Sequence, residues 1–180
     1  MLLFPDNTVL VNFALIGRLD LLDELVRGRS AWTHAVSEEC RESARQPGLH
    51  SMKMLADTFG EPLTLQTSRE ITDARSFRAR MAGPGDPPKK HLGEAEALAI
   101  ISNRASGDVF VTDDQAARDL ARTLEVITYS TCQLLRLAVR SRRLTAQNAW
   151  QHVTALRRHP RRLLDSPKEA HTYFAWCSAA

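Results

Sequence analysis

Several carboxylates along the chain have the spacing to hold a divalent metal ion. Asp6 follows the first predicted strand, and Asp113 and Asp114 follow the strand "VFVT". Glu39 and Glu96 lie in the first turns of two predicted helices that enter from nearby loops. Because the carboxyl ends of parallel strands in an α/β protein share one edge of the sheet, we expect these side chains to converge.

The chemistry expected of such a cluster is metal-assisted hydrolysis. Carboxylates that converge without cations repel one another, which raises their pKa values, and a divalent ion removes that repulsion. Oxygen ligands without a His or Cys partner favour Mg²⁺ or Mn²⁺ over zinc. These ions activate water and stabilise charge on phosphate oxygens, so the pattern indicates a nuclease centre. Each acid taken singly fits equally well as a helix cap or a solvated surface group.

The order of the acids resembles that of the PIN-domain family, in particular the VapC-like ribonuclease toxins and their relatives. The likeness rests on "PDNTVLVN", "AVSEEC", "GEAEALAI" and "VFVTDDQAAR", and it covers about residues 2–145. The resemblance implies four catalytic acids, Asp6, Glu39, Glu96 and Asp114, of which Asp6, Glu96 and Asp114 would be metal ligands. Many relatives have Asp where this chain has Glu96.

The same resemblance implies a fold and a function. The fold would be a three-layer α/β/α sandwich with a central, mainly parallel sheet. The function would be an Mg²⁺- or Mn²⁺-dependent endoribonuclease, the toxin of a toxin-antitoxin pair, whose small antitoxin protein covers the acidic groove with an extended segment. The alternative is a catalytically inactive PIN-like scaffold that binds RNA or a protein partner.

Three neighbouring pairs of acids require a choice. Glu94 and Glu96 point in different directions on one helix, and the step from Glu96 to Asp114 matches the family's step between its third and fourth acids. Glu94 is therefore expected to be a first-turn acid at the groove rim. Adjacent helical residues diverge by about 100°, so only one of the pair at 38 and 39 faces the groove, and the resemblance favours Glu39. We favour Asp114 over Asp113, which would cap the helix or support the ligand.

Other polar residues near these motifs allow two interpretations each. Thr8 either supports a ligand carboxylate or caps a helix, and Asn12 is either part of the core or faces the site. Arg118 is expected to form a surface pair with Asp114 one turn earlier. The six histidines lack ligand spacing and are expected on the surface or in the core: His34, His50, His91, His152, His159 and His171.

Short strands alternating with helices predict an α/β domain with a mainly parallel sheet and helices on both faces. Strands are expected at residues 2–4, 62–67, 107–112 and 125–130. Helices are expected at residues 8–17, 18–27, from about 35 to 46, 51–59, 68–81, 92–103, 113–124, 131–143 and 145–159. Ser68 is the predicted N-cap of its helix, and residues 82–91 form the clearest loop.

The composition fits one compact domain covering residues 1–180, with 43% hydrophobic residues. The 24 basic and 21 acidic residues are unevenly distributed, because residues 126–164 contain eight arginines and no acid. This basic, helical C-terminal third (about 131–162) could bind RNA phosphates or could be a solvated helix surface. The arginines at its end are Arg157, Arg158, Arg161 and Arg162. Lys89 and Lys90 lie closer to the predicted site.

The remaining patterns exclude several protein classes. Three widely spaced cysteines without a CxxC pair suggest neither a disulfide framework nor a zinc knuckle. The chain lacks GxGxxG and GxxxxGK[ST], so dinucleotide and P-loop sites are unsupported, and the late acid pair disfavours a phosphoacceptor receiver domain. No long uncharged apolar run predicts a membrane span. We expect a cytoplasmic protein with RNA and antitoxin partners, and a homodimer is left open.

Overall fold

A small parallel sheet forms the centre of the molecule. The computed structural model describes residues 1–26, 28–104, 107–159 and 163–179. In these residues the sheet has three strands in the order β1-β2-β3: β1 (Leu3–Pro5), β2 (Val109–Val111) and β3 (Ile127–Tyr129). All pair in parallel, and Pro5, Val111 and Tyr129 are in register, so the strands end at one edge.

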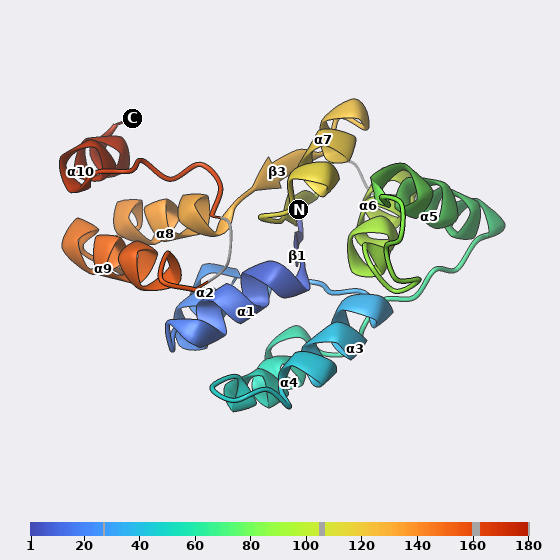
Figure 1. Cartoon of the computed structure of the whole chain (residues 1–180), viewed down its shortest axis with the longest axis horizontal. Coiled ribbons are helices and arrows are strands. Elements are labelled where there is room, and N and C mark those ends of the chain that lie inside the picture. The colour runs from blue at the N-terminus through green and yellow to red at the C-terminus, as the bar shows by residue number, and fades with distance from the viewer. Residues whose placement is uncertain (27, 105–106, 160–162, 180) are drawn as a thin grey trace.

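Helices cover both faces of the sheet (Figure 1). One face carries α1 (Asn7–Leu15), α2 (Leu19–Val26), α3 (His34–Ser43), the 3₁₀ helix η1 (His50–Met54), α4 (Leu55–Phe59), α8 (Thr131–Arg140), α9 (Ala146–Leu156) and α10 (Ala170–Ser178). The other face carries α5 (Ser68–Met81), α6 (Leu92–Arg104) and α7 (Gln115–Thr123).

The alternation of side chains along the strands divides the core into two clusters. Val109 and Val111 of β2 pack into the cluster formed with α1, α2 and α8, whereas Phe110 joins Phe4 of β1 in the cluster under α5, α6 and α7. Successive side chains of a strand point to opposite faces, so a strand of three residues contributes side chains to both clusters. The prediction of a three-layer α/β/α fold is confirmed.

The predicted strand at residues 62–67 does not form. Only an isolated bridge between Thr33 and Leu63 occurs there. The neighbouring backbone groups bond to side chains instead, since Arg104 donates to the carbonyl of Thr64 and the amide of Gln66 donates to Glu70. Backbone groups satisfied in this way leave no continuous ladder for a strand.

Two helix starts also differ from expectation. The N-cap of α5 is Thr67 rather than Ser68: Thr67 accepts from the amide of Glu70, and Glu70 accepts from the amide of Thr67 in a reciprocal capping box. Helix α3 begins at His34 behind its cap Thr33, which moves Glu39 from the predicted first turn to the second. None of the described helices is long and apolar enough to cross a lipid bilayer.

Candidate metal centre

The strand ends bring chain segments from opposite ends of the sequence together. The amide of Asp6 donates to the carbonyl of Val111 at 2.9 Å, and the amide of Thr112 donates to that of Tyr129 at 2.8 Å. The residues that follow β1 and β2 therefore lie side by side at the carboxyl edge of the sheet. This is the edge at which the acids were expected to converge.

Asp6 is buried and tightly held at this edge. Its Oδ1 accepts from the amide of Val9 at 2.8 Å, which makes Asp6 the N-cap of α1, and its Oδ2 accepts from the hydroxyl of Thr112 at 2.5 Å. Burial, and then the charge of Glu94, raise the pKa of Asp6 well above its ordinary value. Thr8 is not the helix cap, and Thr112 provides the hydroxyl support that Thr8 was considered for.

The two adjacent aspartates after β2 have different surroundings. Asp114 caps α7 by accepting from the amide of Ala117 at 2.8 Å with Oδ1. Asp113 is buried and accepts from Nδ2 of the Asn12 side chain at 3.0 Å and from the hydroxyl of Thr131. Burial raises the pKa of Asp113. Asp114 thus combines the cap with a free oxygen, while Asp113 joins Asn12 in a buried network beneath the site.

The start of α6 separates the two glutamates of "GEAE". Glu94 faces the other acids, and its charge is among the causes that raise the pKa values of both Asp6 and Glu39. Glu96 instead accepts from the amide of Ala35 at 3.0 Å, in the first turn of α3. Its carboxylate is therefore engaged in joining α6 to the start of α3. The role of Glu96 as a metal ligand stays a prediction, but the groove is lined by Glu94.

Glu39 lies on the neighbouring helix, at the closest approach of α3 to α6. A Cβ atom on Gly93 would lie 2.8 Å from Cγ2 of Val36 and 3.2 Å from Oε1 of Glu39, so glycine is required for this spacing. Burial, and then the charge of Glu94, raise the pKa of Glu39 to about 7. Glu38 points outward and pairs with Arg41, so Glu39 is the one of the two that faces the site.

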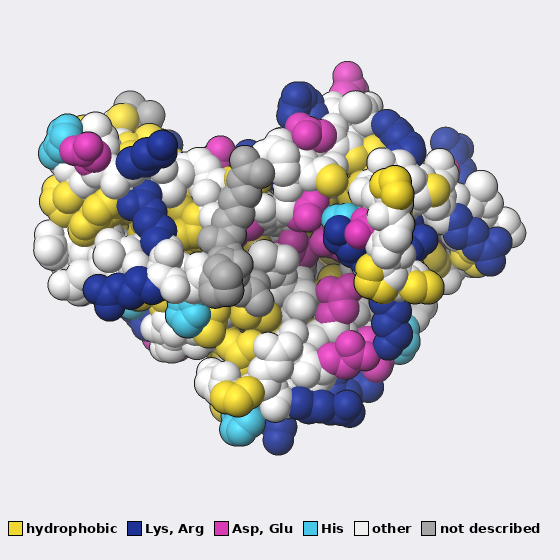
Figure 2. All heavy atoms as spheres, in the orientation of Figure 1, with side chains coloured by type: hydrophobic (Ala, Val, Ile, Leu, Met, Phe, Trp, Pro, Cys, Tyr) yellow, Lys and Arg dark blue, Asp and Glu magenta, His cyan; other side chains and the backbone are white. Residues whose placement is uncertain are grey.

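Glu39, Glu94 and Asp114 line an acidic groove of about 350 Å³. Figure 2 shows acidic side chains gathered in a hollow near the centre of the visible face, with basic side chains around it. The groove is lined by Asn7, Glu39, Glu42, Ser43, Gln46, Pro87, Lys89, Lys90, His91, Glu94 and Asp114. The two lysines already have partners, because Lys89 pairs with Glu42 and Lys90 with Asp86.

His91 is the site residue that sequence reasoning missed. Its Nδ1 lies 3.8 Å from Oε1 of Glu94 and 4.0 Å from Oδ2 of Asp114. The pKa of His91 is raised, chiefly by the carboxylate of Glu94. Its place immediately before the helix that carries Glu94 is a signal that could have identified it, whereas a search for two histidines at metal-ligand spacing could not.

The basic neighbour of the carboxylates of the centre is His91, which lies 3.8 Å from Glu94 and 4.0 Å from Asp114. In the described part of the chain, no lysine or arginine forms an ion pair with Asp6, Glu39, Glu94 or Asp114. Arg118, expected beside Asp114, pairs with Asp165 instead. The raised pKa values of Asp6 and Glu39 are the consequence, because a buried carboxylate without a nearby cation favours its protonated form.

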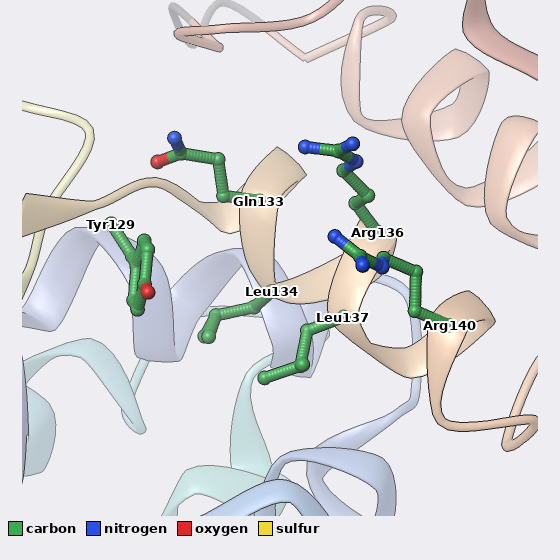
Figure 3. Close-up of a pocket in the computed structure, with 6 residues that line it drawn as sticks. All are labelled: Tyr129, Gln133, Leu134, Arg136, Leu137 and Arg140. Atoms are coloured by element: carbon green, nitrogen blue, oxygen red, sulfur yellow. The ribbon is translucent and has the colours of Figure 1, made fainter. Parts of the chain in front are cut away.

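Three arginines of the basic C-terminal third make internal contacts. Arg143 pairs with Glu24, and Arg157 donates to Ser166 and to the carbonyls of Pro167 and Lys168. Arg136 donates to the carbonyl of Ala179 and stacks on Trp176. It also lines a small hollow with Tyr129, Gln133, Leu134, Leu137 and Arg140 (Figure 3). Phosphate binding by this region stays a prediction, and Arg161 and Arg162 lie outside the described residues.

Comparison with known proteins gives one finding on the family. A family model described as a PIN domain matches residues 4–170. Neither the curated proteins nor the solved structures give a match. The matched span includes β1 from Phe4 onward, all of β2 and β3, and every residue that lines the acidic groove.

Proposed function

The chain belongs to the PIN-domain family, and we propose that it is a metal-dependent endoribonuclease whose centre is the acidic groove. PIN domains are generally nucleases that hydrolyse phosphodiester bonds and bind divalent metal ions. The observation that carries the proposal is the convergence of Asp6, Glu39, Glu94 and Asp114, with which no lysine or arginine forms an ion pair among the described residues. Mg²⁺ or Mn²⁺ would supply the missing positive charge.

The residues fit such an ion by their chemistry. Asp6, Glu94 and Asp114 offer hard carboxylate oxygens, and the bonds of Asp6 to Thr112 and of Asp114 to the start of α7 fix two of them in place. When bound, the ion would activate water and stabilise charge on the phosphate. Glu39, facing these three from α3, is the residue proposed to orient the attacking water and accept its proton.

The surroundings of the groove fit a polyanionic substrate. Lys89 and Lys90 lie on its wall, although each is paired with an exposed or half-buried acid. Exposed pairs of this kind contribute little stability, so the lysines are free to exchange their partners for RNA phosphates. RNA is therefore the proposed substrate, and the contacts would be independent of its sequence.

The choice between the two glutamates is the sharpest test of the centre. Replacing Glu94 by Gln is expected to lower Mn²⁺-dependent RNA cleavage by about 100-fold, a loss typical of removing one catalytic group. Glu96→Gln is the matched control: it weakens a bond to the α3 backbone, costs about 1 kcal/mol of stability and leaves most of the cleavage intact. The opposite pattern would restore Glu96 as the ligand, and cleavage unaffected by either change would reject the centre.

A toxin of a toxin-antitoxin pair is the proposed biological setting, on the strength of the resemblance in motif order. A small antitoxin would insert an extended segment into the acidic groove, where it would exclude RNA. Expression of the chain alone should then arrest growth, and co-expression with the antitoxin should restore it. If the chain neither cleaves RNA nor gains thermal stability with Mn²⁺, the inactive PIN-like scaffold replaces the nuclease.

A further inference from the structure

His91 has a buried polar atom for which the described residues supply no partner. The residue is 7% exposed, and its Nδ1 makes no hydrogen bond. The two nearest oxygens, on Glu94 and Asp114, are 3.8 and 4.0 Å away, too far for a hydrogen bond. A buried nitrogen that faces two carboxylates without bonding to either leaves a space between three potential ligand atoms.

The separations of these atoms fit a shared cation. Nδ1 of His91, a carboxylate oxygen of Glu94 and one of Asp114 all lie within 4.8 Å of one another. An ion with bonds of about 2.1 Å places two ligands at most about 4.2 Å apart. Both distances from His91 fall within that limit, and the separation of the two carboxylate oxygens is at most 4.8 Å.

The backbone at this position is unusual for a histidine. His91 has φ of 61°, in the left-handed region that costs a non-glycine residue about 1 kcal/mol. Its carbonyl accepts from the amide of Ala95 at 3.1 Å, so it precedes the first turn of α6, where a short polar residue would cap better. Neither local conformation nor capping accounts for the imidazole, which instead adds a nitrogen to the wall of the acidic groove.

We propose that His91 is a direct nitrogen ligand of the divalent ion, together with Glu94 and Asp114, and that the centre therefore prefers Mn²⁺ to Mg²⁺. This inference rests on the proposed function, which supplies the ion. Mg²⁺ binds almost entirely through oxygen and water, whereas the first-row transition ions accept imidazole. A centre in which a nitrogen ligand joins the carboxylates thus discriminates between ions that an all-oxygen centre would bind similarly.

The ligand can be observed directly in the Mn²⁺-loaded full-length protein. Pulsed electron paramagnetic resonance detects the hyperfine coupling of a ¹⁴N nucleus bonded to Mn²⁺, and we expect that signal in the wild-type protein. His91→Asn should abolish it, since Asn tolerates the left-handed backbone but presents no imidazole. The matched control is His171→Asn, which changes an exposed histidine on α10 and should keep the signal.

Affinity provides a second readout that does not depend on cleavage. His91→Asn should weaken Mn²⁺ binding by about tenfold while leaving Mg²⁺ binding within about twofold, so the preference for Mn²⁺ falls. Bound Mn²⁺ without a ¹⁴N coupling, or a coupling that persists in His91→Asn, would overturn the inference. The proposed function would survive that result if Glu94→Gln still abolished Mn²⁺ binding. A wild-type protein that binds no Mn²⁺ would overturn both.

Discussion

Asp6 and Glu70 are both buried acids at the start of a helix, yet their pKa values are shifted in opposite directions. Asp6 is 2% exposed and caps α1, and Glu70 is 1% exposed and belongs to the capping box of α5. The pKa of Glu70 is lowered to about 2, chiefly by hydrogen bonds from Arg104, which approach to 2.6 and 2.9 Å. The pKa of Asp6 is raised well above its ordinary value, chiefly by burial.

The difference lies in the partner rather than in the acid. Glu70 has a guanidinium and two backbone amides, so its charge is stabilised within the fold. Asp6 has one amide and one hydroxyl, and its nearest charged neighbours are acids. A buried carboxylate paired with an arginine therefore stabilises the fold. A buried carboxylate surrounded by other carboxylates instead points to a functional site that binds a cation.

The largest expected effect comes from neutralising the uncompensated acid. Asp6→Asn should reduce RNA cleavage by about 100-fold or more, because it removes a carboxylate from the metal centre. Its thermal stability should be unchanged or higher, since Asn also caps helices and the charge repulsion is relieved. Cleavage assays and thermal unfolding of the same preparation test this. Full cleavage by Asp6→Asn would contradict the proposal that Asp6 belongs to the metal centre.

Removing the cation from the compensated acid should have the reverse outcome. Arg104→Ala is expected to lower the free energy of unfolding by about 2 kcal/mol, and the Tm by roughly 4–8 °C, because Glu70 stays buried without its main partner. Cleavage per folded molecule should not change. Arg41→Ala is the control, since it breaks an exposed pair with Glu38 and should cost less than about 0.5 kcal/mol.

Binding of a cation at the acidic groove should raise the free energy of unfolding by a smaller amount. At about ten times its Kd, Mn²⁺ is expected to raise the stability of the wild-type protein by about 1.4 kcal/mol, or roughly 3–5 °C in Tm. Arg104→Ala should show the same increment from its lower starting point, and Asp6→Asn should show little or none. An equal increment in Asp6→Asn would mean that the ion stabilises the protein elsewhere.

The two regions also differ in the pH dependence of stability, measured without metal. The folded protein holds Glu70 ionised down to about pH 2, so the stability that Glu70 contributes is lost as pH falls from about 4.5 towards 2. Glu39, with its pKa raised to about 7, binds its proton more tightly in the folded state. Stability therefore falls as pH rises from about 4.5 to 7.

Single variants isolate these two slopes in denaturant unfolding across the pH range. Glu70→Gln should be less stable than the wild-type protein at neutral pH. This difference in the free energy of unfolding should shrink below about pH 4, because protonation of the wild-type Glu70 removes the stability that its charge contributes. Glu39→Gln should gain relative to the wild-type protein between about pH 4.5 and 7. Parallel curves for Glu39→Gln and the wild-type protein would show that Glu39 ionises normally in the folded state.

The sequence allowed the fold class and the convergence of acids at one edge of the sheet to be predicted, but not every contact. Strong apolar runs predicted the three strands, and Asp6 and Asp114 follow two of them as expected. The prediction of a strand at 62–67 was wrong because the local pattern carries no information on Arg104, a residue distant in sequence that donates to the carbonyl of Thr64. His91 was missed because its burial depends on the turn that brings α6 against α3.

The two glutamates of "GEAE" show the same limit on a smaller scale. Counting residues favoured Glu96. In the structure the carboxylate of Glu96 accepts from the backbone amide of Ala35 in α3, and Glu94 lines the groove. The close approach at Gly93 fixes this rotation, since α6 contacts α3 directly there. A one-dimensional spacing rule cannot include a contact between two helices, so it could place the acid pair but not show which member lines the groove.

The pairing of β1 with β2 also determines when the centre can exist. The hydroxyl of Thr112 and the carboxylate of Asp6, which it holds, are 106 residues apart, and the strands that carry them become neighbours only when the intervening chain has been closed into a loop. Long loop closures of this kind are slow steps in folding. A chain still being synthesised cannot complete the acidic groove before residue 114 emerges.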